Sequence, residues 1–256
     1  MTNERRVLVH PDKAALAGAV AARFITKMLD ILDEQAVAHV VLTGGGMAAS
    51  VHEAVAASPA CMTIDWSRVH FWWGDERWVP AGDAERNDEQ ARTALLDALE
   101  LPAENLHPFP ASDGELDLDE AAEAYSAELA QHGVDGLPHP IFDITFLGVG
   151  PDGHIASLFP HRSGIQVTDR TVIPVRNSPK PPPERLSLTR PVINSSQRVW
   201  LVLAGADKAS ALGLALAGAS RDEVPVAGIK GRKRTVFFVD GDAAAEVPET
   251  LIARDY

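Results

Sequence analysis

The sequence predicts an α/β protein with a doubly wound, mainly parallel sheet flanked by helices. Short apolar segments, rich in β-branched and aromatic residues, alternate along the chain with segments of helical periodicity. Four of the apolar segments run directly into glycine and then into polar residues, as strands do at the carboxyl edge of an open sheet. We find no internal repeat and no long low-complexity linker, so we expect residues 1–256 to form one domain.

The first half of the chain supplies strands and the longest helix. Apolar residues recur every fourth position in residues 11–33, which is the buried stripe of an amphipathic helix; they are Leu16, Val20, Phe24, Met28 and Leu32. Further helices are expected at residues 47–57, 87–100 and 117–131. Strands are expected at residues 6–9, 40–42 and 69–73, with a short one at 106–110.

The second half is expected to complete the sheet. A buried strand lies within residues 142–149, because Ile144, Phe146, Leu147 and Val149 are apolar. Further strands are expected at residues 171–175, 186–188, 198–204 and 235–239. Residues 207–217 should be helical, and residues 191–195 should form a short helix or turn. Three consecutive prolines, Pro181 to Pro183, make residues 177–184 an extended loop.

Composition excludes several classes of protein. Apolar residues are 46% and charged residues 23% of the 256, as in ordinary globular chains, and no apolar run is long enough to span a membrane. The first six residues lead into a strand and not into a signal-peptide core. A single cysteine, Cys61, suits a reducing compartment, so we expect a cytoplasmic protein without a membrane partner. The net charge of −13 argues against a nucleic-acid partner.

Asp152 and His154 stand side by side in a glycine turn directly after the strand within residues 142–149. Gly148, Gly150 and Gly153 satisfy the dinucleotide-binding pattern G-x-G-x-x-G. That reading needs a long helix and a second strand, however, and Pro160 would end any helix after about two turns. A plainer alternative is that the turn needs only its glycines and that His154 is incidental.

Three other turns follow the same order of apolar strand, glycine and polar residues. They are residues 43–46, 74–77 and 205–208. Because the carboxyl ends of parallel strands lie along one edge of a sheet, the four turns should meet at a single cleft.

Two of these turns are suited to an anion. Thr43, Gly44, Gly45 and Gly46 open a helix, and the free N–H groups of a first helical turn attract phosphate. The turn lacks the Lys-Ser/Thr of a nucleoside triphosphate loop. Lys208 also begins a helix, where the macrodipole disfavours a cation unless both share an anion. A simple solvated lysine is the alternative.

Two charged segments complete the candidate site. Asp75, Glu76 and Arg77 follow an apolar strand, and they form either part of the site or an internal ion pair. Lys180 and Arg185 are presented by the stiff proline-rich segment Ser-Pro-Lys-Pro-Pro-Pro-Glu-Arg, which could instead be a rigid connector.

The turn after the strand also carries a resemblance. Residues 148–160, Gly-Val-Gly-Pro-Asp-Gly-His-Ile-Ala-Ser-Leu-Phe-Pro, resemble the central signature of the 6-phosphogluconolactonases, which are similar in fold to the glucosamine-6-phosphate isomerases/deaminases. The Asp-Glu-Arg run and the proline-rich segment resemble the lactonases as well. The resemblance implies a Rossmann-like, sugar-phosphate isomerase-like fold. The deaminases carry a glutamate five residues after the histidine, where this chain has Phe159.

Membership of the lactonase branch would imply hydrolysis of 6-phospho-D-glucono-1,5-lactone to 6-phospho-D-gluconate, in the oxidative pentose phosphate pathway. His154 is then the expected general base, since imidazole titrates near neutral pH, and Asp152 would orient it. Arg77, beside Asp75, would balance charge on the carbonyl or carboxylate. The phosphate would be held by Gly44, Gly45 and Gly46 with Lys208, and further by Thr43, Lys180 and Arg185.

Other functions stay open. One is an isomerase or deaminase acting on an amino-sugar phosphate, and another is a non-catalytic sugar-phosphate sensor. The nine histidines show no zinc-site spacing, so we expect no metal and no other cofactor. The expected partner is a small-molecule sugar phosphate lactone, bound by a monomer or weak homo-oligomer.

Overall fold

A central sheet of seven parallel strands forms the middle of the molecule. The computed structural model describes residues 4–252. The strands lie in the order β1-β10-β9-β6-β2-β3-β5, and every neighbouring pair is parallel. Their bounds are β1 Glu4–His10, β2 Ala38–Leu42, β3 Val69–Trp73, β5 Leu106–His107, β6 Ile144–Leu147, β9 Arg198–Leu203 and β10 Arg234–Asp240. The expected doubly wound sheet is confirmed.

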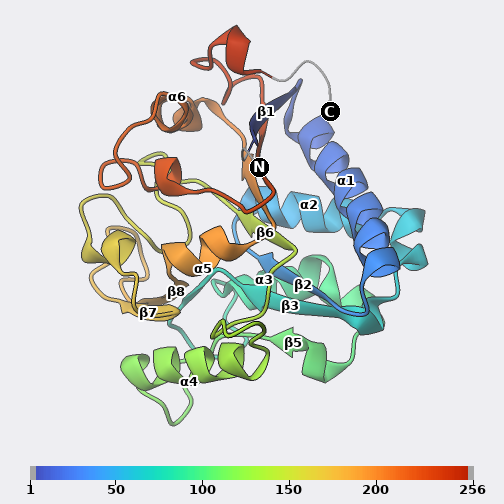
Figure 1. The fold of residues 1–256 in the computed structure, drawn as a ribbon, viewed down its shortest axis with the longest axis vertical. Coiled ribbons are helices and arrows are strands. Elements are labelled where there is room, and N and C mark those ends of the chain that lie inside the picture. The colour runs from blue at the N-terminus through green and yellow to red at the C-terminus, as the bar shows by residue number, and fades with distance from the viewer. Residues whose placement is uncertain (1–3, 253–256) are drawn as a thin grey trace.

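Helices pack around this sheet (Figure 1). They are α1 Lys13–Glu34, α2 Gly46–Ala56, α3 Asn87–Ala94, α4 Leu118–Gln131, α5 Arg190–Ser195 and α6 Ala209–Leu216. In two of them, the side chain of the residue just before the helix caps its start. The Asp12 carboxylate accepts the Ala15 N–H at the start of α1, and Asp117 forms a capping box with Glu120 at the start of α4. No described helix is long and apolar enough to cross a membrane.

A second, three-stranded antiparallel sheet lies beside the first. It has the order β4-β8-β7, with β4 Asp75–Arg77, β7 Val172–Val175 and β8 Arg185–Leu188. The sequence predicted β7 and β8 as strands but placed the Asp-Glu-Arg run in a turn. A three-residue charged strand has no apolar alternation to reveal it, and its pairing with β8 is decided by tertiary contacts.

Three predicted boundaries also change. The helix expected at residues 87–100 ends at Ala94 and continues as a 3₁₀ turn, Leu96–Ala98, after Leu95 leaves helical geometry at φ −150°. The helix expected at residues 207–217 starts as a 3₁₀ turn, Ala206–Lys208. The short strand expected at residues 106–110 is only β5, because prolines at 108 and 110 lack the N–H that a ladder needs.

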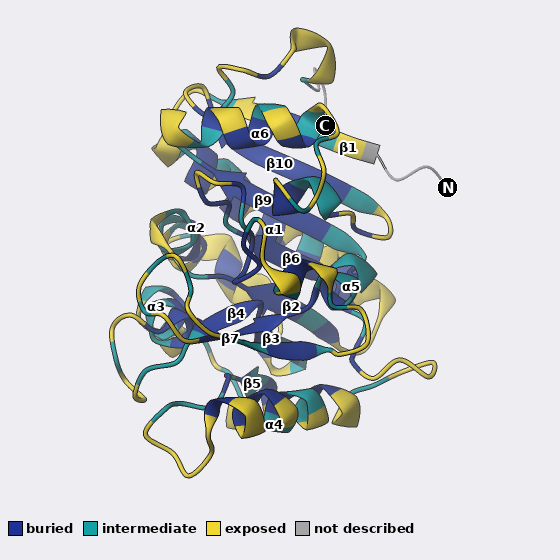
Figure 2. Ribbon diagram, turned by 90° about the vertical axis from the view of Figure 1, so that its left-hand side faces the viewer, coloured by how far each residue is buried: buried dark blue, intermediate teal, exposed yellow. Residues whose placement is uncertain are grey.

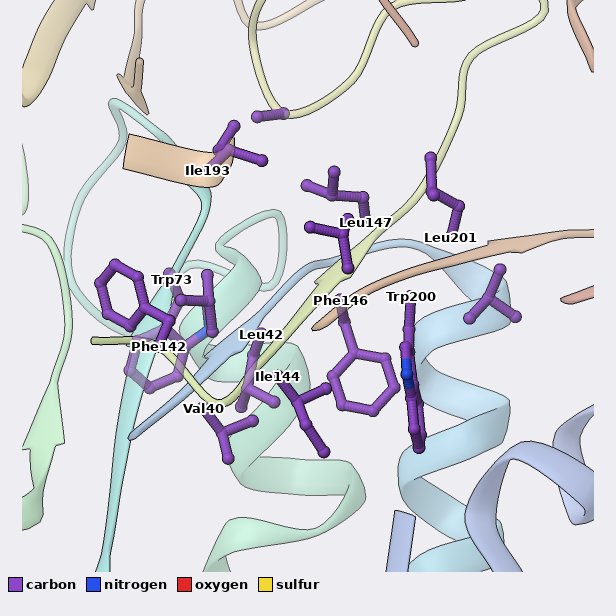
Figure 3. Packing of buried hydrophobic residues seen from close by; sticks show 14 of the residues in the cluster. Val40, Leu42, Trp73, Phe142, Ile144, Phe146, Leu147, Ile193, Trp200 and Leu201 are labelled. Atoms are coloured by element: carbon purple, nitrogen blue, oxygen red, sulfur yellow. The ribbon is translucent and has the colours of Figure 1, made fainter. Parts of the chain in front are cut away.

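The core follows the sheet. Figure 2 shows buried residues along the central strands, while the outer surfaces of α4 and α6 are exposed. Aromatic rings fill the space on β6 and β9, where Phe146 meets Trp200 edge-on with ring centroids 5.5 Å apart (Figure 3). Phe24 of α1 packs against Phe146 from the helix layer. This packing fixes β6, and therefore fixes where its carboxyl end delivers the next residues.

Candidate active site

The turns that follow β2, β3, β6 and β9 meet at one cleft of about 640 Å³. The sequence-based prediction that these turns converge is therefore confirmed. The predicted residues that line the cleft are Thr43, Gly44, Gly45, Gly46, Asp75, Arg77, His154, Lys180, Arg185 and Lys208. Asp152 reaches the cleft through its contact with His154.

His154 and Asp152 form a closely bonded pair at this cleft. The Asp152 Oδ1 lies 2.5 Å from the His154 Nδ1. The imidazole Nε2 is therefore left to exchange a proton with a molecule bound in the cleft. Burial opposes ionisation of Asp152, but the hydrogen bond and charge of His154, with Lys180, outweigh burial and lower its pKa to about 2. Asp152 is therefore a carboxylate at neutral pH and favours a proton on the Nδ1.

Gly150 makes this pairing possible. The Gly150 N–H donates to the His154 carbonyl oxygen at 2.9 Å, which folds the turn back on itself. A Cβ atom at Gly150 would lie 2.0 Å from the His154 Nδ1 and 2.5 Å from the Asp152 Oδ1. The glycine is therefore required for space.

The three charged side chains of the Asp-Glu-Arg run alternate in direction along strand β4. Asp75 and Arg77 line the cleft, whereas Glu76 is buried. The Glu76 carboxylate accepts the Asn87 N–H at 2.7 Å and the Asp88 N–H at 2.9 Å, and so caps the start of α3. Burial raises the pKa of Glu76, while the neighbouring Arg86 charge and these N–H groups oppose the rise. Glu76 therefore belongs to the scaffold.

Asp75 connects three parts of the cleft wall. Its Oδ2 accepts the Ser157 hydroxyl at 2.7 Å and lies 4.0 Å from the Arg185 Nη1, and its backbone oxygen accepts the Asn87 side-chain amide at 2.8 Å. The Asn87 Oδ1 is buried and has no hydrogen-bond partner among the described residues. A Cβ at Gly44 would lie 1.8 Å from this oxygen. The glycine turn and Asn87 therefore occupy the same wall in close contact.

Arg185 is committed mainly to its own loop. Its guanidinium donates to the carbonyl oxygens of Pro181 at 2.8 Å, Pro182 at 3.2 Å and Lys180 at 3.3 Å. Burial lowers the pKa of Arg185, although the Asp75 charge opposes the shift. These bonds hold the loop so that Lys180 faces Asp152, with the Lys180 Nζ 3.9 Å from the Asp152 Oδ1.

Helix starts also contribute to the lining of the cleft. Gly45 adopts φ +96°, a conformation that favours glycine, and α2 begins at the next residue. The Gly45 N–H already donates to the Gln90 side chain at 3.0 Å. Lys208 lies at the start of α6, where its Nζ is 3.0 Å from the Asp207 carboxylate. The glycine turn at the start of α2 and the lysine at the start of α6 both favour binding of a dianion.

Lys13 and Asn87 are among the cleft residues that sequence reasoning missed. Lys13, the first residue of α1, lines the cleft together with Lys208. The signal that singled out Lys208, a cation at a helix start, applies equally to Lys13. Asn87 also lines the cleft, but the sequence holds no signal for it, since Glu76 fixes its position through tertiary contacts.

Comparison with known proteins places the chain in a family. Residues 11–238 match the family described as glucosamine-6-phosphate isomerases/6-phosphogluconolactonase. The chain belongs to this family. It is similar to the 6-phosphogluconolactonase of Streptomyces coelicolor, with 48% identity over 255 residues that cover 98% of each protein. The resemblance inferred from the motifs is thus confirmed.

Solved structures of the family share the fold. The crystal structure of 6-phosphogluconolactonase from Thermotoga maritima aligns with a TM-score of 0.81 and 29% identity, covering 93% of this chain and all of that one. A monomeric glucosamine-6-phosphate deaminase aligns with a TM-score of 0.77 at 19% identity, covering 94% and 99%. The deaminase likeness concerns the fold alone, so it does not separate the two activities of the family.

Proposed function

We propose that the chain hydrolyses 6-phospho-D-glucono-1,5-lactone to 6-phospho-D-gluconate, a reaction of the oxidative pentose phosphate pathway. The observation that carries this is the His154–Asp152 pair at a cleft that is also lined by helix starts and lysines. The histidine–aspartate pair is suited to activating water, and the helix starts with their lysines are suited to holding a phosphate. The lactonase relatives match along nearly the whole chain, which supports the same activity here.

In the proposed reaction, the His154 Nε2 takes a proton from a water molecule as its oxygen attacks the lactone carbonyl carbon. A bond forms between that oxygen and C1, and the carbonyl oxygen becomes negatively charged. When the carbonyl re-forms, the bond from C1 to the ring oxygen breaks. His154 then returns the proton to this leaving oxygen, which becomes a hydroxyl, and the new carboxylic acid loses its remaining proton to solvent. Asp152 stabilises the imidazolium between the two transfers.

Cationic groups have separate roles in this proposal. Arg77 lines the cleft and would balance the negative charge on the reacting carbonyl or product carboxylate. Lys208, Lys13 and the α2 start with Gly44, Gly45 and Gly46 would hold the phosphate. The hydrogen bonds of Arg185 within its own loop favour a positioning role for Arg185. Lys180, which this loop directs toward Asp152, is then the residue that would contact the substrate.

The deaminase alternative is disfavoured by Phe159. Its ring is buried, and its centroid lies 4.7 Å from that of the His154 imidazole. The isomerases and deaminases use a glutamate at this position, and a buried phenyl ring can neither accept nor donate a proton. A non-catalytic sensor would have no use for a paired His154 and Asp152, which is the arrangement of a general base.

The activity is tested by lactone turnover measured against spontaneous hydrolysis. His154→Ala should lose at least about a hundredfold in kcat, the usual scale for a lost general base, while remaining folded by circular dichroism. Glucosamine 6-phosphate serves as the control substrate and should not be consumed. Deamination of that substrate, or near wild-type lactone turnover by folded His154→Ala, would contradict the proposal.

We also propose a cytoplasmic monomer or weak homo-oligomer with one domain. A single buried cysteine and the absence of a spanning helix among residues 4–252 are compatible with the cytoplasm. One continuous hydrophobic cluster extends from Val7 to Val247, which supports one domain. The net charge of −13 disfavours nucleic acid as a partner.

A further inference from the structure

Four histidines gather on the sheet face that α4 covers, away from the cleft. His39 of β2 lies directly beside His70 of β3 in the parallel register, and Trp72 pairs with His107 of β5. Side chains two residues apart on a strand share a face, so the His70 and Trp72 rings lie on the same side of the sheet. His132, at the end of α4, brings a fourth imidazole to the group.

Three of these rings bring nitrogen atoms together. One ring nitrogen each from His70, His107 and His132 lies within 4.8 Å of the others. The His70 Nδ1 is 2.8 Å from the His107 Nε2. Ring stacking explains part of this arrangement, because the His107 and Trp72 centroids are 3.8 Å apart. Stacking alone does not explain why a nitrogen of His132 arrives at the same point from a different element.

Glu128 sets the orientation of the central ring. Its Oε1 lies 2.8 Å from the His107 Nδ1, so the proton of the neutral imidazole is held on that nitrogen. The lone pair is then on the His107 Nε2, which is the atom directed at His70. Histidine ligands of metals commonly donate their other N–H to a carboxylate in this way. The carboxylate–histidine pair is therefore an independent feature of a ligand site.

We propose that His70, His107 and His132 form a site for a zinc ion, with Glu128 as the supporting carboxylate. Zinc binds imidazole nitrogens at about 2.0–2.1 Å, which places the ligand nitrogens of a tetrahedral site about 3.3 Å apart. The observed separations, from 2.8 Å up to 4.8 Å, bracket that value and require side-chain adjustments of up to about 1.5 Å. A water molecule would supply the fourth ligand, because His70 and His132 are partly exposed.

Burial favours the neutral form of two of the three rings, His70 and His107. Burial, together with repulsion from neighbouring histidines, lowers the pKa of His70 to about 4, and burial also lowers the pKa of His107. His39 is held apart from the ligand set, since its Nδ1 accepts the Trp72 indole N–H at 3.1 Å. A bound ion would connect the end of α4 to β3 and β5.

The site is distinct from the proposed chemistry. None of the four histidines lines the described cleft, which opens at the carboxyl ends of the strands, whereas His39 and His70 are second residues of β2 and β3. The ion would therefore stabilise the fold without taking part in catalysis. Removing it with a chelator should leave lactone hydrolysis essentially unchanged.

The test is a zinc titration of the full chain after treatment with a chelator, followed by calorimetry and by thermal unfolding. Wild type should bind one zinc ion per chain, and its melting temperature should rise with zinc concentration. Glu128→Gln should weaken binding about 10–100-fold, the range found for supporting carboxylates. His132→Gln, at an exposed helix end, should weaken it at least as much. His161→Asn is the matched control, because His161 is exposed and has φ +57°, which asparagine tolerates.

The outcomes separate this site from the cleft. Unchanged affinity in both Glu128→Gln and His132→Gln would overturn the proposal, as would failure of wild type to bind. Binding that disappears in His154→Gln but persists in His132→Gln would place the ion at the cleft and overturn it equally. Circular dichroism of each apo variant establishes that lost binding does not reflect lost folding. Failure here would leave the lactonase proposal untouched, because that proposal requires no metal.

Discussion

At the scale of single residues, cationic side chains line the cleft, although the chain as a whole carries a net negative charge. Lys208 and Lys13 lie at the starts of α6 and α1, positions where the helix macrodipole opposes a positive charge. A phosphate dianion bound between them would remove this conflict, because it is attracted both by the helix starts and by the lysines. The Asp207 carboxylate lies 3.0 Å from the Lys208 Nζ and balances only the charge of that lysine.

Lys208→Ala should therefore weaken binding of the phosphorylated lactone. A charge-assisted contact is worth about 1.5–3 kcal/mol, so KM for the phosphorylated lactone should rise about tenfold or more. The effect on kcat should be smaller, unless binding at the phosphate positions the lactone. The preference for phosphorylated over plain gluconolactone should narrow, and kcat/KM for both lactones measures it.

Lys27→Ala is the control for this change. Lys27 is paired with Asp30 on α1 and lies outside the cleft, so its removal should leave both substrates unaffected. If Lys208→Ala loses activity equally for the two lactones, Lys208 has a structural role and other cations hold the phosphate.

At the scale of elements, the link between β4 and α3 determines one wall of the site. Glu76→Gln keeps the side-chain shape but offers only one acceptor oxygen to the Asn87 and Asp88 N–H groups. Loss of one bond to a buried carboxylate should lower the free energy of unfolding by about 1.5–3 kcal/mol. Because Asn87 lines the cleft, kcat/KM should fall as well. Urea unfolding and lactone kinetics on the same preparation measure both effects.

Glu89→Gln provides the comparison, since Glu89 lies in the same first turn of α3 without capping it. That variant should change neither property appreciably. Wild-type stability in Glu76→Gln would mean that the Glu76 carboxylate is dispensable for starting α3.

Elements with their own periodicity were predictable, and elements defined by distant partners were not. The stripe of α1 and the apolar strands β2, β3, β6 and β9 follow from local sequence, and so does their meeting at one edge. Strand β4 exists only through pairing with β8, and Glu76 is turned inward by that pairing. The histidine group likewise comes from residues 70, 107 and 132, a spacing that matches no metal-binding motif.

The same division holds within the site. Glycine turns after strands identified the cleft, because backbone geometry and sheet topology leave local signatures. The division of labour among its cations depends on contacts made in three dimensions. Arg185 was expected to hold phosphate. Its guanidinium instead donates to the carbonyl oxygens of Pro181 and Pro182 in its own loop.

At the scale of the whole molecule, buried neutral histidines connect folding to pH. His52 lies on α2 and is only 5% exposed, and burial lowers its pKa to about 4. In the unfolded chain an imidazole titrates near pH 6.5. Between these two values the unfolded chain binds the proton and the folded chain does not. Stability from this group is therefore complete above about pH 6.5 and is lost progressively as the pH falls toward 4.

The expected loss can be measured by urea unfolding at pH 7.5 and pH 5 in the presence of a chelator. His52 alone should lower the free energy of unfolding by about 2 kcal/mol at pH 5, from its shift of about 2.5 pKa units. His52→Leu, which replaces the imidazole with an apolar group of similar size, should show a correspondingly smaller loss. His161→Asn removes an exposed histidine and should lose as much stability as wild type. Equal losses in wild type and His52→Leu would mean that burial of His52 does not set the acid sensitivity between pH 7.5 and pH 5, and that other buried histidines, such as His39, set it.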